Sequence, residues 1–229
     1  MDYKVLFNPF FWKICFLFFV FILFFDSINQ LNLENKYFFV HLIHTFVKQS
    51  IYMNSLEIAY IAGGCFWCTE AVFQSLNGVQ KIVSGYMGGT VKNPAYREVC
   101  SGRTGHTEGI QVVFDPSIIS FNEILSVFFA THDPTTLNRQ GNDVGSQYRS
   151  SIFYTSEAQK EFALQRIAEL EKTTFDAPIV TELLPETPFY KAEDEHLNYY
   201  KNNSNQPYCS YIIDPKIQKL KQHYQHLLK

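Results

Sequence analysis

A strand pattern that stops at two glycines and changes at once into a helix pattern is the feature that most constrains this chain. Leu56, Ile58 and Tyr60 alternate with Glu57, Ala59 and Ile61 before Gly63-Gly64, which is typical of a short strand and a tight turn. From residue 65 the apolar spacing is helical up to Asn77-Gly78, a common helix stop. The pattern therefore predicts a strand, a turn and a helix that begins at Cys65.

Cys65 stands where a thiol is expected to become a nucleophile. The free N–H groups and the positive dipole end of a helix N-terminus stabilise a thiolate, so we expect the pKa of Cys65 to be lowered. Phe66 and Trp67 follow it and offer apolar faces for a small greasy substrate group. A small core cysteine, the C-x-x-C pair of a thioredoxin-like oxidoreductase with Cys68, and half a zinc site remain alternatives, although the chain has no second C-x-x-C.

Composition excludes several function classes. The formal net charge of -3 gives no basic field for nucleic acid. Five cysteines in 229 residues are too few for a disulfide scaffold, and their odd number leaves a thiol free for chemistry. No metal, flavin or nicotinamide signature is visible, because GYMGG at residues 85–89 lacks the full dinucleotide spacing.

Composition also changes at Met53. Twelve of the 22 Phe and none of the 11 Gly precede it. Residues 14–25 form an apolar run of ICFLFFVFILFF, which is short for a membrane span of about 17 to 25 residues. We expect an apolar leader over residues 1–52, either a mis-assigned translation start, a signal anchor or a cleaved signal, and one catalytic domain over residues 53–229.

Strand and helix patterns alternate after Met53. Strands are expected at residues 79–83, 110–114, 151–154 and 179–184. Helices are expected from the Ser120 capping box through Phe129, over residues 156–172 and 189–200, and at the C-terminus. The lysines of residues 216–221 are expected on a solvated face of the C-terminal helix. Residues 85–105 and 132–149 are expected to be long loops, the second an active-site wall. The order favours an α+β fold, a two-layer α/β sandwich with a ferredoxin-like mixed sheet.

Four separated motifs resemble a known family. In chain order they are GGCFWCTEAVF, GYMGGTVKNPAYREVCSGRTGHTEGIQVVFDP, HDPTTLNRQGNDVGSQYRS and TPFYKAEDEH. They resemble the A-type peptide methionine sulfoxide reductases over residues 57–216. The resemblance implies thiol-dependent reduction of methionine (S)-sulfoxide, in proteins and as the free amino acid, through a cysteine sulfenic acid. A thioredoxin-like oxidoreductase using Cys65 and Cys68 becomes the alternative function.

The resemblance also implies a role for each matching residue. Cys65 is then the nucleophile and Glu108 the general acid, which a carboxyl can be at neutral pH only if burial raises its pKa. Tyr96, Tyr148 and Asp143 match polar members of the family's site. Phe66 and Trp67 match the residues around the substrate methyl group. His106, His132 and His196 are expected to have structural roles.

Recycling of the sulfenic acid needs a second thiol. Cys209 is the first choice, because it matches the family's tail cysteine and its polar segment, KNNSNQPYCSY, is expected to be mobile. Cys68, three residues after Cys65, is the competitor, and Cys100 is expected to be buried. With no bound cofactor or metal expected, thioredoxin would supply the electrons. We expect a monomer, more readily cytoplasmic than membrane-anchored or exported, with membrane contact only through residues 1–52.

Overall fold

The computed structural model describes residues 56–229 together with His41 and Thr45. The chain divides into the units Met1–Asn54 and Ser55–Lys229, and the following account concerns the second unit. The predictions for residues 1–52 lie outside the described residues. In the described part, no helix combines the length and apolar character needed to cross a bilayer.

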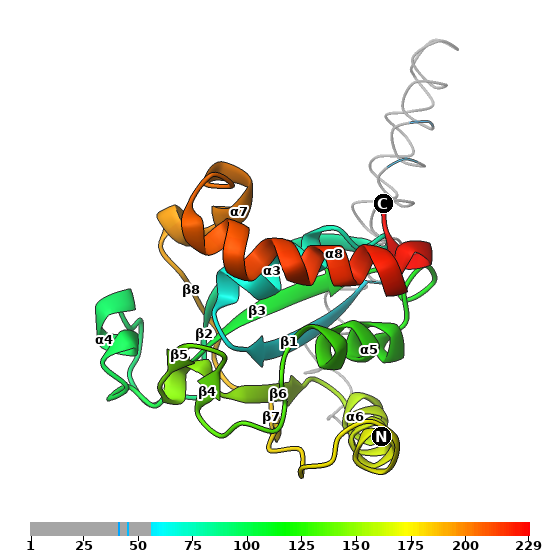
Figure 1. Ribbon diagram of the computed structural model, residues 1–229, viewed down its shortest axis with the longest axis horizontal. Coiled ribbons are helices and arrows are strands. Elements are labelled where there is room, and N and C mark those ends of the chain that lie inside the picture. The colour runs from blue at the N-terminus through cyan, green and yellow to red at the C-terminus, as the bar shows by residue number, and fades with distance from the viewer. Residues whose placement is uncertain (1–40, 42–44, 46–55) are drawn as a thin grey trace, which may run out of the picture. The chain divides into compact units, whose positions relative to one another are not determined.

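A six-stranded sheet in the order β7-β6-β1-β3-β2-β8 forms the framework (Figure 1). Neighbouring strands are antiparallel, apart from the parallel pair of β6 and β7, so the sheet is mixed as predicted. The units β1-α3-β2-β3-α5-β6, with the spatial order β6-β1-β3-β2, have the ferredoxin-like arrangement. The strands of this sheet are β1 (Glu57–Gly63), β2 (Val79–Met87), β3 (Thr107–Phe114), β6 (Ser150–Tyr154), β7 (Glu182–Pro185) and β8 (Tyr190–Lys191).

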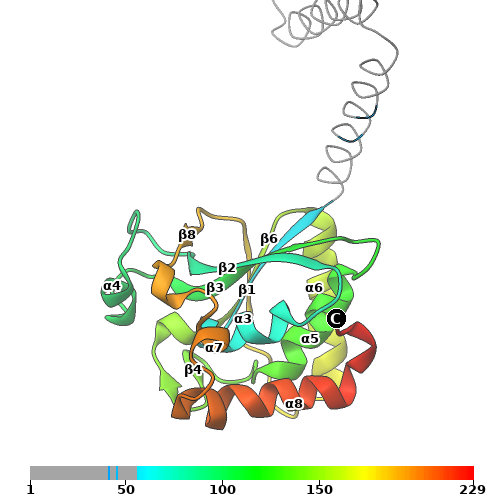
Figure 2. The same ribbon diagram turned by 90° about the horizontal axis from the view of Figure 1, so that it is seen from above.

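The longer helices lie on one side of this sheet (Figure 2). Helices α3 and α5 contact its strands, α6 packs against α5, and the C-terminal α8 packs against α3 and α5. These helices are α3 (Phe66–Gln74), α5 (Phe121–Thr131), α6 (Glu157–Thr173) and α8 (Asp214–His223). The prediction of a two-layer sandwich is confirmed, with α8 added on the outside of the helix layer.

Local sequence explains where α5 begins. The Ser120 hydroxyl accepts a hydrogen bond from the Glu123 N–H at 3.2 Å, and the Glu123 carboxylate accepts one from the Ser120 N–H at 2.8 Å. This reciprocal capping box satisfies two free N–H groups of the first turn. Buried side chains of α5, including Ile124 and Phe128, then face the core that fills the space between helices and sheet.

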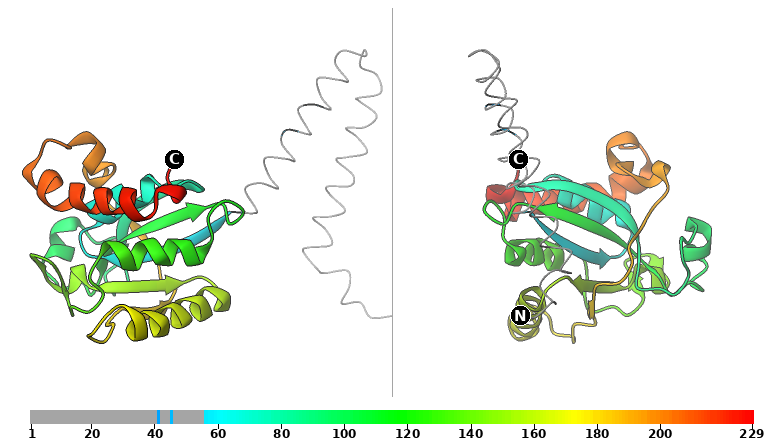
Figure 3. Two further views of the ribbon diagram at one scale, coloured as in Figure 1. Left: turned by 45° about the vertical axis from the view of Figure 1, so that its right-hand side comes forward. Right: turned by 180° about the vertical axis from the view of Figure 1, so that it is seen from behind.

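Several shorter elements surround one end of the sheet. The segments that carry α4, the β4–β5 hairpin and α7 lie toward this end (Figures 1 and 3). They are α4 (Tyr96–Cys100), β4 (Arg139–Gln140), β5 (Asp143–Val144), the 3-10 helices η2 (Ser146–Tyr148) and η3 (Asp194–His196), α7 (Tyr199–Asn202) and the π-helix η4 (Cys209–Ile213). The 3-10 helix η5 (Gln225–Leu227) follows α8 and lies beside the residues that follow α3. The two expected loops thus contain short ordered elements, and β2 continues to Met87.

The predicted helix over residues 189–200 is wrong. Tyr190 and Lys191 instead form β8 and pair with Tyr86 and Gly85 of β2. A Cβ atom on Gly85 would lie 2.4 Å from the Tyr190 carbonyl oxygen, so the missing side chain lets the edge strand approach. A sheet partner at this distance in sequence overrides the local helical spacing.

Candidate functional site

The turn between β1 and α3 places Cys65 at the start of the helix. Gly64 has a φ of +92°, and a Cβ atom there would lie 2.6 Å from Cγ of Gln140. The Cys65 carbonyl accepts the N–H groups of Cys68 and Thr69 at 3.1 and 3.4 Å. The predicted strand–turn–helix unit is therefore present, with Cys65 as the N-cap residue of α3.

Glu108 comes to this helix start from β3, across the sheet. Its carboxylate accepts a hydrogen bond from the Phe66 N–H at 3.1 Å, and its exposed fraction is 1%. Burial raises the pKa of Glu108 to about 8, with smaller contributions from the negative charges of Asp143 and Cys68. The Phe66 N–H acts in the opposite direction but does not balance burial. Glu108 is therefore protonated at neutral pH and can donate a proton.

The expected lowering of the Cys65 pKa is wrong for the free protein. Burial raises the pKa of this thiol, and its hydrogen bond to Cys68 and the nearby Glu108 act in the same direction. The first N–H of the helix, that of Phe66, points to Glu108, and Cys65 makes no side-chain capping bond. The N-terminal N–H of the helix thus binds the Glu108 carboxyl group rather than the Cys65 sulfur, and Cys65 is a protonated thiol before substrate binds.

Cys68 is the more acidic thiol of the two. Its hydrogen bond with Cys65 lowers the pKa of Cys68 to about 7, against the effect of burial, and the charge of Lys216 acts in the same direction as the hydrogen bond. The Tyr208 hydroxyl lies 3.6 Å from the Cys68 sulfur and donates to Asp143 at 2.9 Å. Cys68 therefore loses its proton more readily than Cys65 in the resting protein.

Two tyrosines stand around Glu108 and the thiols. Burial raises the pKa of both Tyr96 and Tyr148, and the charge of Glu108 contributes to each. Tyr148 also senses the charges of Cys65 and Asp143. Both hydroxyls therefore stay protonated over the neutral range and can donate hydrogen bonds. The structure thus brings Tyr96, Tyr148, Asp143 and Glu108 near the helix start, as the motifs predict.

An aromatic cluster covers the first turn of α3. Phe66 has an exposed fraction of 1% and contacts the ring of His196, with 5.6 Å between centroids. The Trp67 ring stacks on Tyr199 at 3.6 Å and meets the edge of Tyr208. Phe66 and Trp67 thus belong to a larger aromatic wall, to which the C-terminal third of the chain contributes.

Two further residues belong to this wall, His196, for which the sequence predicted only a structural role, and Tyr199, which it did not indicate. His196 lies 4.2 Å from the Tyr96 ring, and its buried Nδ1 has no hydrogen-bond partner within the described part of the chain. Tyr199 is held by its own N–H, which donates to the buried Glu70 carboxylate at 3.3 Å. The TPFYKAEDEH motif ends at His196 and could have indicated it, whereas nothing local marked Tyr199.

Glu193, which follows β8 in the chain, positions Tyr96. The carboxylate of Glu193 accepts hydrogen bonds from the Tyr96 N–H and the Tyr86 hydroxyl, both at 2.8 Å. Tyr86 is fully buried and contacts Phe66 at 5.8 Å between centroids. The first turn of α4 is thereby tied to the core beneath the helix start.

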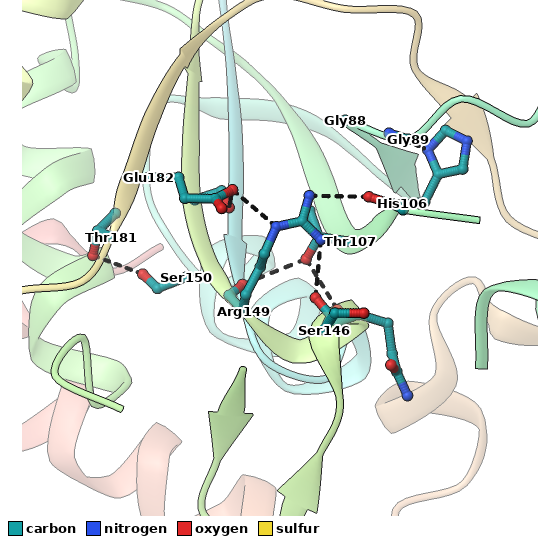
Figure 4. A network of polar contacts seen from close by, with 12 residues as sticks. Gly88, Gly89, His106, Thr107, Ser146, Arg149, Ser150, Thr181 and Glu182 are labelled. Atoms are coloured by element: carbon teal, nitrogen blue, oxygen red, sulfur yellow. Dashed lines mark hydrogen bonds and ion pairs between the residues drawn. The ribbon is translucent and has the colours of Figure 1, made fainter. Parts of the chain in front are cut away.

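Arg149 fixes the loop that carries Tyr148 (Figure 4). Its guanidinium donates to the Glu182 carboxylate at 2.8 Å and to the carbonyls of Ser146 and Gly105 at 2.9 and 3.1 Å. The Thr107 hydroxyl donates to the Arg149 carbonyl at 3.4 Å. Residues on three separate segments are thus joined beside Glu108, which follows Thr107 in β3.

The remaining predicted residues have clear positions. His106 accepts the Gly89 N–H and binds the Val91 carbonyl, and burial lowers the pKa of His132 to about 4, so both have the structural roles expected. Cys100 is half-buried rather than buried and interacts with Tyr96. Cys209 is 0% exposed and lies in the helical segment η4.

A cavity of about 430 Å³ opens beside the two thiols. Its lining comes from the α3 start, the β4–β5 hairpin, η4 and α8, and includes Cys65, Cys68, Asp143, Tyr208 and Lys216. Among the described residues, no group of three His, Cys, Asp or Glu side chains is placed to hold a metal ion. The arrangement supplies a thiol pair, a protonated carboxyl group, two hydroxyl donors and an apolar wall.

Comparisons with known proteins agree with this arrangement. A family model described as peptide methionine sulfoxide reductase matches residues 57–228. The peptide methionine sulfoxide reductase MsrA of Deinococcus radiodurans is 57% identical over 169 residues, which cover 73% of this chain and 82% of that protein. MsrA of Sulfolobus acidocaldarius is 54% identical over 72% of this chain and 93% of its own length.

Solved structures show the same likeness. Methionine sulfoxide reductase A of Corynebacterium diphtheriae matches with a TM-score of 0.60 and 38% identity, over 66% of this chain and 76% of that one. Mxr1 from Saccharomyces cerevisiae in reduced form matches with a TM-score of 0.64 and 34% identity, over 68% and 90%. The range that the family model matches, residues 57–228, includes the thiols, Glu108 and the aromatic wall.

Proposed function

The chain belongs to the peptide methionine sulfoxide reductase family, and we propose that Cys65 is its nucleophile and Glu108 its general acid. It is an enzyme that reduces methionine sulfoxide by thiol chemistry, and a thioredoxin-like oxidoreductase is not favoured. The observation that carries the proposal is the protonated, buried Glu108, hydrogen-bonded to the residue that follows Cys65. An acid is thereby held beside a thiol, which is what removal of a sulfoxide oxygen needs.

The first step transfers oxygen from substrate to enzyme. The Cys65 sulfur attacks the sulfoxide sulfur, while Glu108 donates its proton to the sulfoxide oxygen and later regains the proton that leaves the Cys65 thiol. The attack forms an S–S bond between Cys65 and the substrate, the S–O bond of the substrate breaks, and the S–S bond breaks in turn as the oxygen binds the Cys65 sulfur. The products are methionine and Cys65 sulfenic acid, so Cys65 loses the two electrons that reduce the substrate.

The surrounding side chains favour this step in two ways. Tyr96 and Tyr148 keep their protons and would donate hydrogen bonds to the oxygen as negative charge develops there. Asp143 would complete the polar side of the site. Phe66 and Trp67 would receive the substrate methyl group, since their rings form the apolar wall next to Cys65.

We propose Cys68 as the thiol that resolves the sulfenic acid. It shares a hydrogen bond with Cys65 and has a pKa of about 7, whereas Cys209, the first choice from sequence, is 0% exposed in a helical segment. The Cys68 thiolate attacks the Cys65 sulfur, the S–O bond breaks, and the leaving hydroxide is protonated to water. Cys209 packs in the same apolar cluster and remains the competitor.

The disulfide that this step leaves must be reduced before the next turnover. A protein dithiol must reduce it by exchange, and we propose thioredoxin as that partner. The (S)-sulfoxide, in proteins and as free methionine sulfoxide, is the proposed substrate. A monomer without nucleic acid as partner stays a prediction. So do the cytoplasmic location and any membrane contact, which depend on residues 1–52, outside the described residues.

Single-turnover mass spectrometry tests these assignments. Cys65→Ser should release no methionine from methionine sulfoxide, since the sulfur proposed to attack the substrate is gone. Cys68→Ser should release one equivalent and then retain Cys65 sulfenic acid, while Cys209→Ser should form the Cys65–Cys68 disulfide. Release of methionine by Cys65→Ser would refute the nucleophile. A Cys65–Cys209 disulfide in the otherwise unaltered protein would assign resolution to Cys209.

A further inference from the structure

Lys216 is a cation next to the thiols that the catalytic step does not use. It lies in α8, two residues after the helix begins at Asp214, and lines the 430 Å³ cavity together with Cys65 and Cys68. A second, much smaller cavity, between α3, α5 and α8, is lined by Lys216, Cys68 and His132. Lys216 is thus half-buried over Cys68, rather than on the solvated helix face where the sequence predicted it.

No ion pair joins Lys216 to a carboxylate in residues 56–229. The ion pairs of this region all lie elsewhere, and the lysine nearest to Lys216 in sequence, Lys219, is exposed. A half-buried ammonium group without an ion-pair partner exerts its field on the neighbouring groups that can become anions. Cys68 is the titratable group that lines both cavities together with Lys216.

The other groups that face Cys68 do not supply positive charge. Cys65 and Tyr208 are neutral hydrogen-bonding neighbours, and His132 is uncharged at neutral pH, because burial lowers its pKa to about 4. The carboxyl groups nearby, those of Asp143 and Glu108, oppose a negative sulfur when they are ionised. The remaining titratable neighbour, Cys209, is a buried thiol with a raised pKa.

We propose that Lys216 is a positioning residue for recycling, whose ammonium group holds the Cys68 sulfur in its anionic form against the surrounding carboxyl groups. The proposal rests on Cys68 being the resolving thiol. In that step the anionic Cys68 sulfur forms the S–S bond to Cys65 as the Cys65 S–O bond breaks, and the oxygen leaves as water after protonation. Lys216 loses no proton and forms no bond in this step, so it acts through the charge state of Cys68.

Titration of thiolate absorbance in the ultraviolet tests the proposal without turnover. Lys216→Met should raise the pKa of Cys68, and a rise of one unit from about 7 would reduce its thiolate fraction at neutral pH about fivefold. Lys216→Arg should restore most of it, because the charge is kept. Lys219→Met, which removes the same charge from an exposed position of the same helix, should leave the titration unchanged. Subtraction of the Cys68→Ser titration isolates the Cys68 signal.

The rate of disulfide formation after a single turnover gives the second readout. Lys216→Met should slow it about fivefold near neutral pH and by less at alkaline pH, where Cys68 ionises unaided. An unchanged Cys68 titration in Lys216→Met, or a loss that Lys216→Arg does not restore, would overturn the role of Lys216. If the titration shifts but Cys68→Ser still forms its disulfide through Cys209, the Lys216–Cys68 interaction holds and the assignment of the resolving thiol fails.

Discussion

Glu108→Gln should weaken catalysis while making the protein more stable at alkaline pH. The pKa of Glu108 rises from an ordinary 4.5 to about 8, and each unit equals about 1.4 kcal/mol. Ionised Glu108 therefore costs the folded state roughly 5 kcal/mol relative to the unfolded chain. A glutamine of nearly the same shape avoids this cost, and its side-chain oxygen can still accept the Phe66 N–H bond.

The sign of the pH dependence follows from proton binding. The folded state keeps the Glu108 proton up to about pH 8, whereas the unfolded state loses it near pH 4.5. Glu108 thus contributes its full stability below about pH 4.5, and the wild type loses it as pH rises toward 8. Between about pH 6 and about pH 9 the stability of Glu108→Gln should gain roughly 3 kcal/mol relative to wild type.

Urea unfolding at both pH values measures this gain, and Glu195→Gln, which alters an exposed carboxylate, is the matched control. Single-turnover release of methionine measures catalysis, which should fall by roughly 10² or more, because the amide cannot donate the proton. The wild-type rate should also decline as pH rises through about 8, as Glu108 loses that proton. A stability difference independent of pH, or a wild-type rate in the variant, would refute the assignment of a protonated acid.

Two further substitutions test how the site is held together. Arg149→Met should lower the free energy of unfolding by about 1–3 kcal/mol, since it removes three guanidinium hydrogen bonds and takes the side-chain donor from the Gly105 carbonyl; equal urea midpoints would contradict this. Gly64→Ala should destabilise by about 1–3 kcal/mol, because its φ is +92° and the new Cβ meets the Gln140 side chain. Gly141→Ala, also at positive φ but with open space around it, is the comparison that separates the clash from backbone strain.

Local sequence was sufficient for most of the framework. The strand before Gly63, the helix after Cys65 and the Ser120 capping box depend on neighbours within a few residues, and the structure has all three. The segment after Pro188 failed because its partner, β2, lies about a hundred residues earlier. Hydrophobic spacing contains no information about such a partner, so the helical reading of residues 189–200 had no local reason to be rejected.

The charge states of the site show the same division between local and distant causes. Helix position alone predicted an acidic Cys65, but the N–H on which that prediction relied is bonded to Glu108, 42 residues away. The motifs could place Glu108 near the thiol only through the family resemblance. Cys68 has Cys65 as a local partner, but Tyr208 and Lys216 come from the C-terminal region.

These distant contacts separate the two halves of the proposed cycle. Glu108 reaches the site from the sheet and keeps a proton for the sulfoxide oxygen, whereas Lys216 reaches it from α8 and favours loss of a proton from Cys68. A single environment could not do both, since a field that retains the carboxyl proton also retains a thiol proton. Glu108 and Lys216 should therefore act on different steps. Substitution of Glu108 should alter reduction of the sulfoxide more, and substitution of Lys216 should alter formation of the disulfide more.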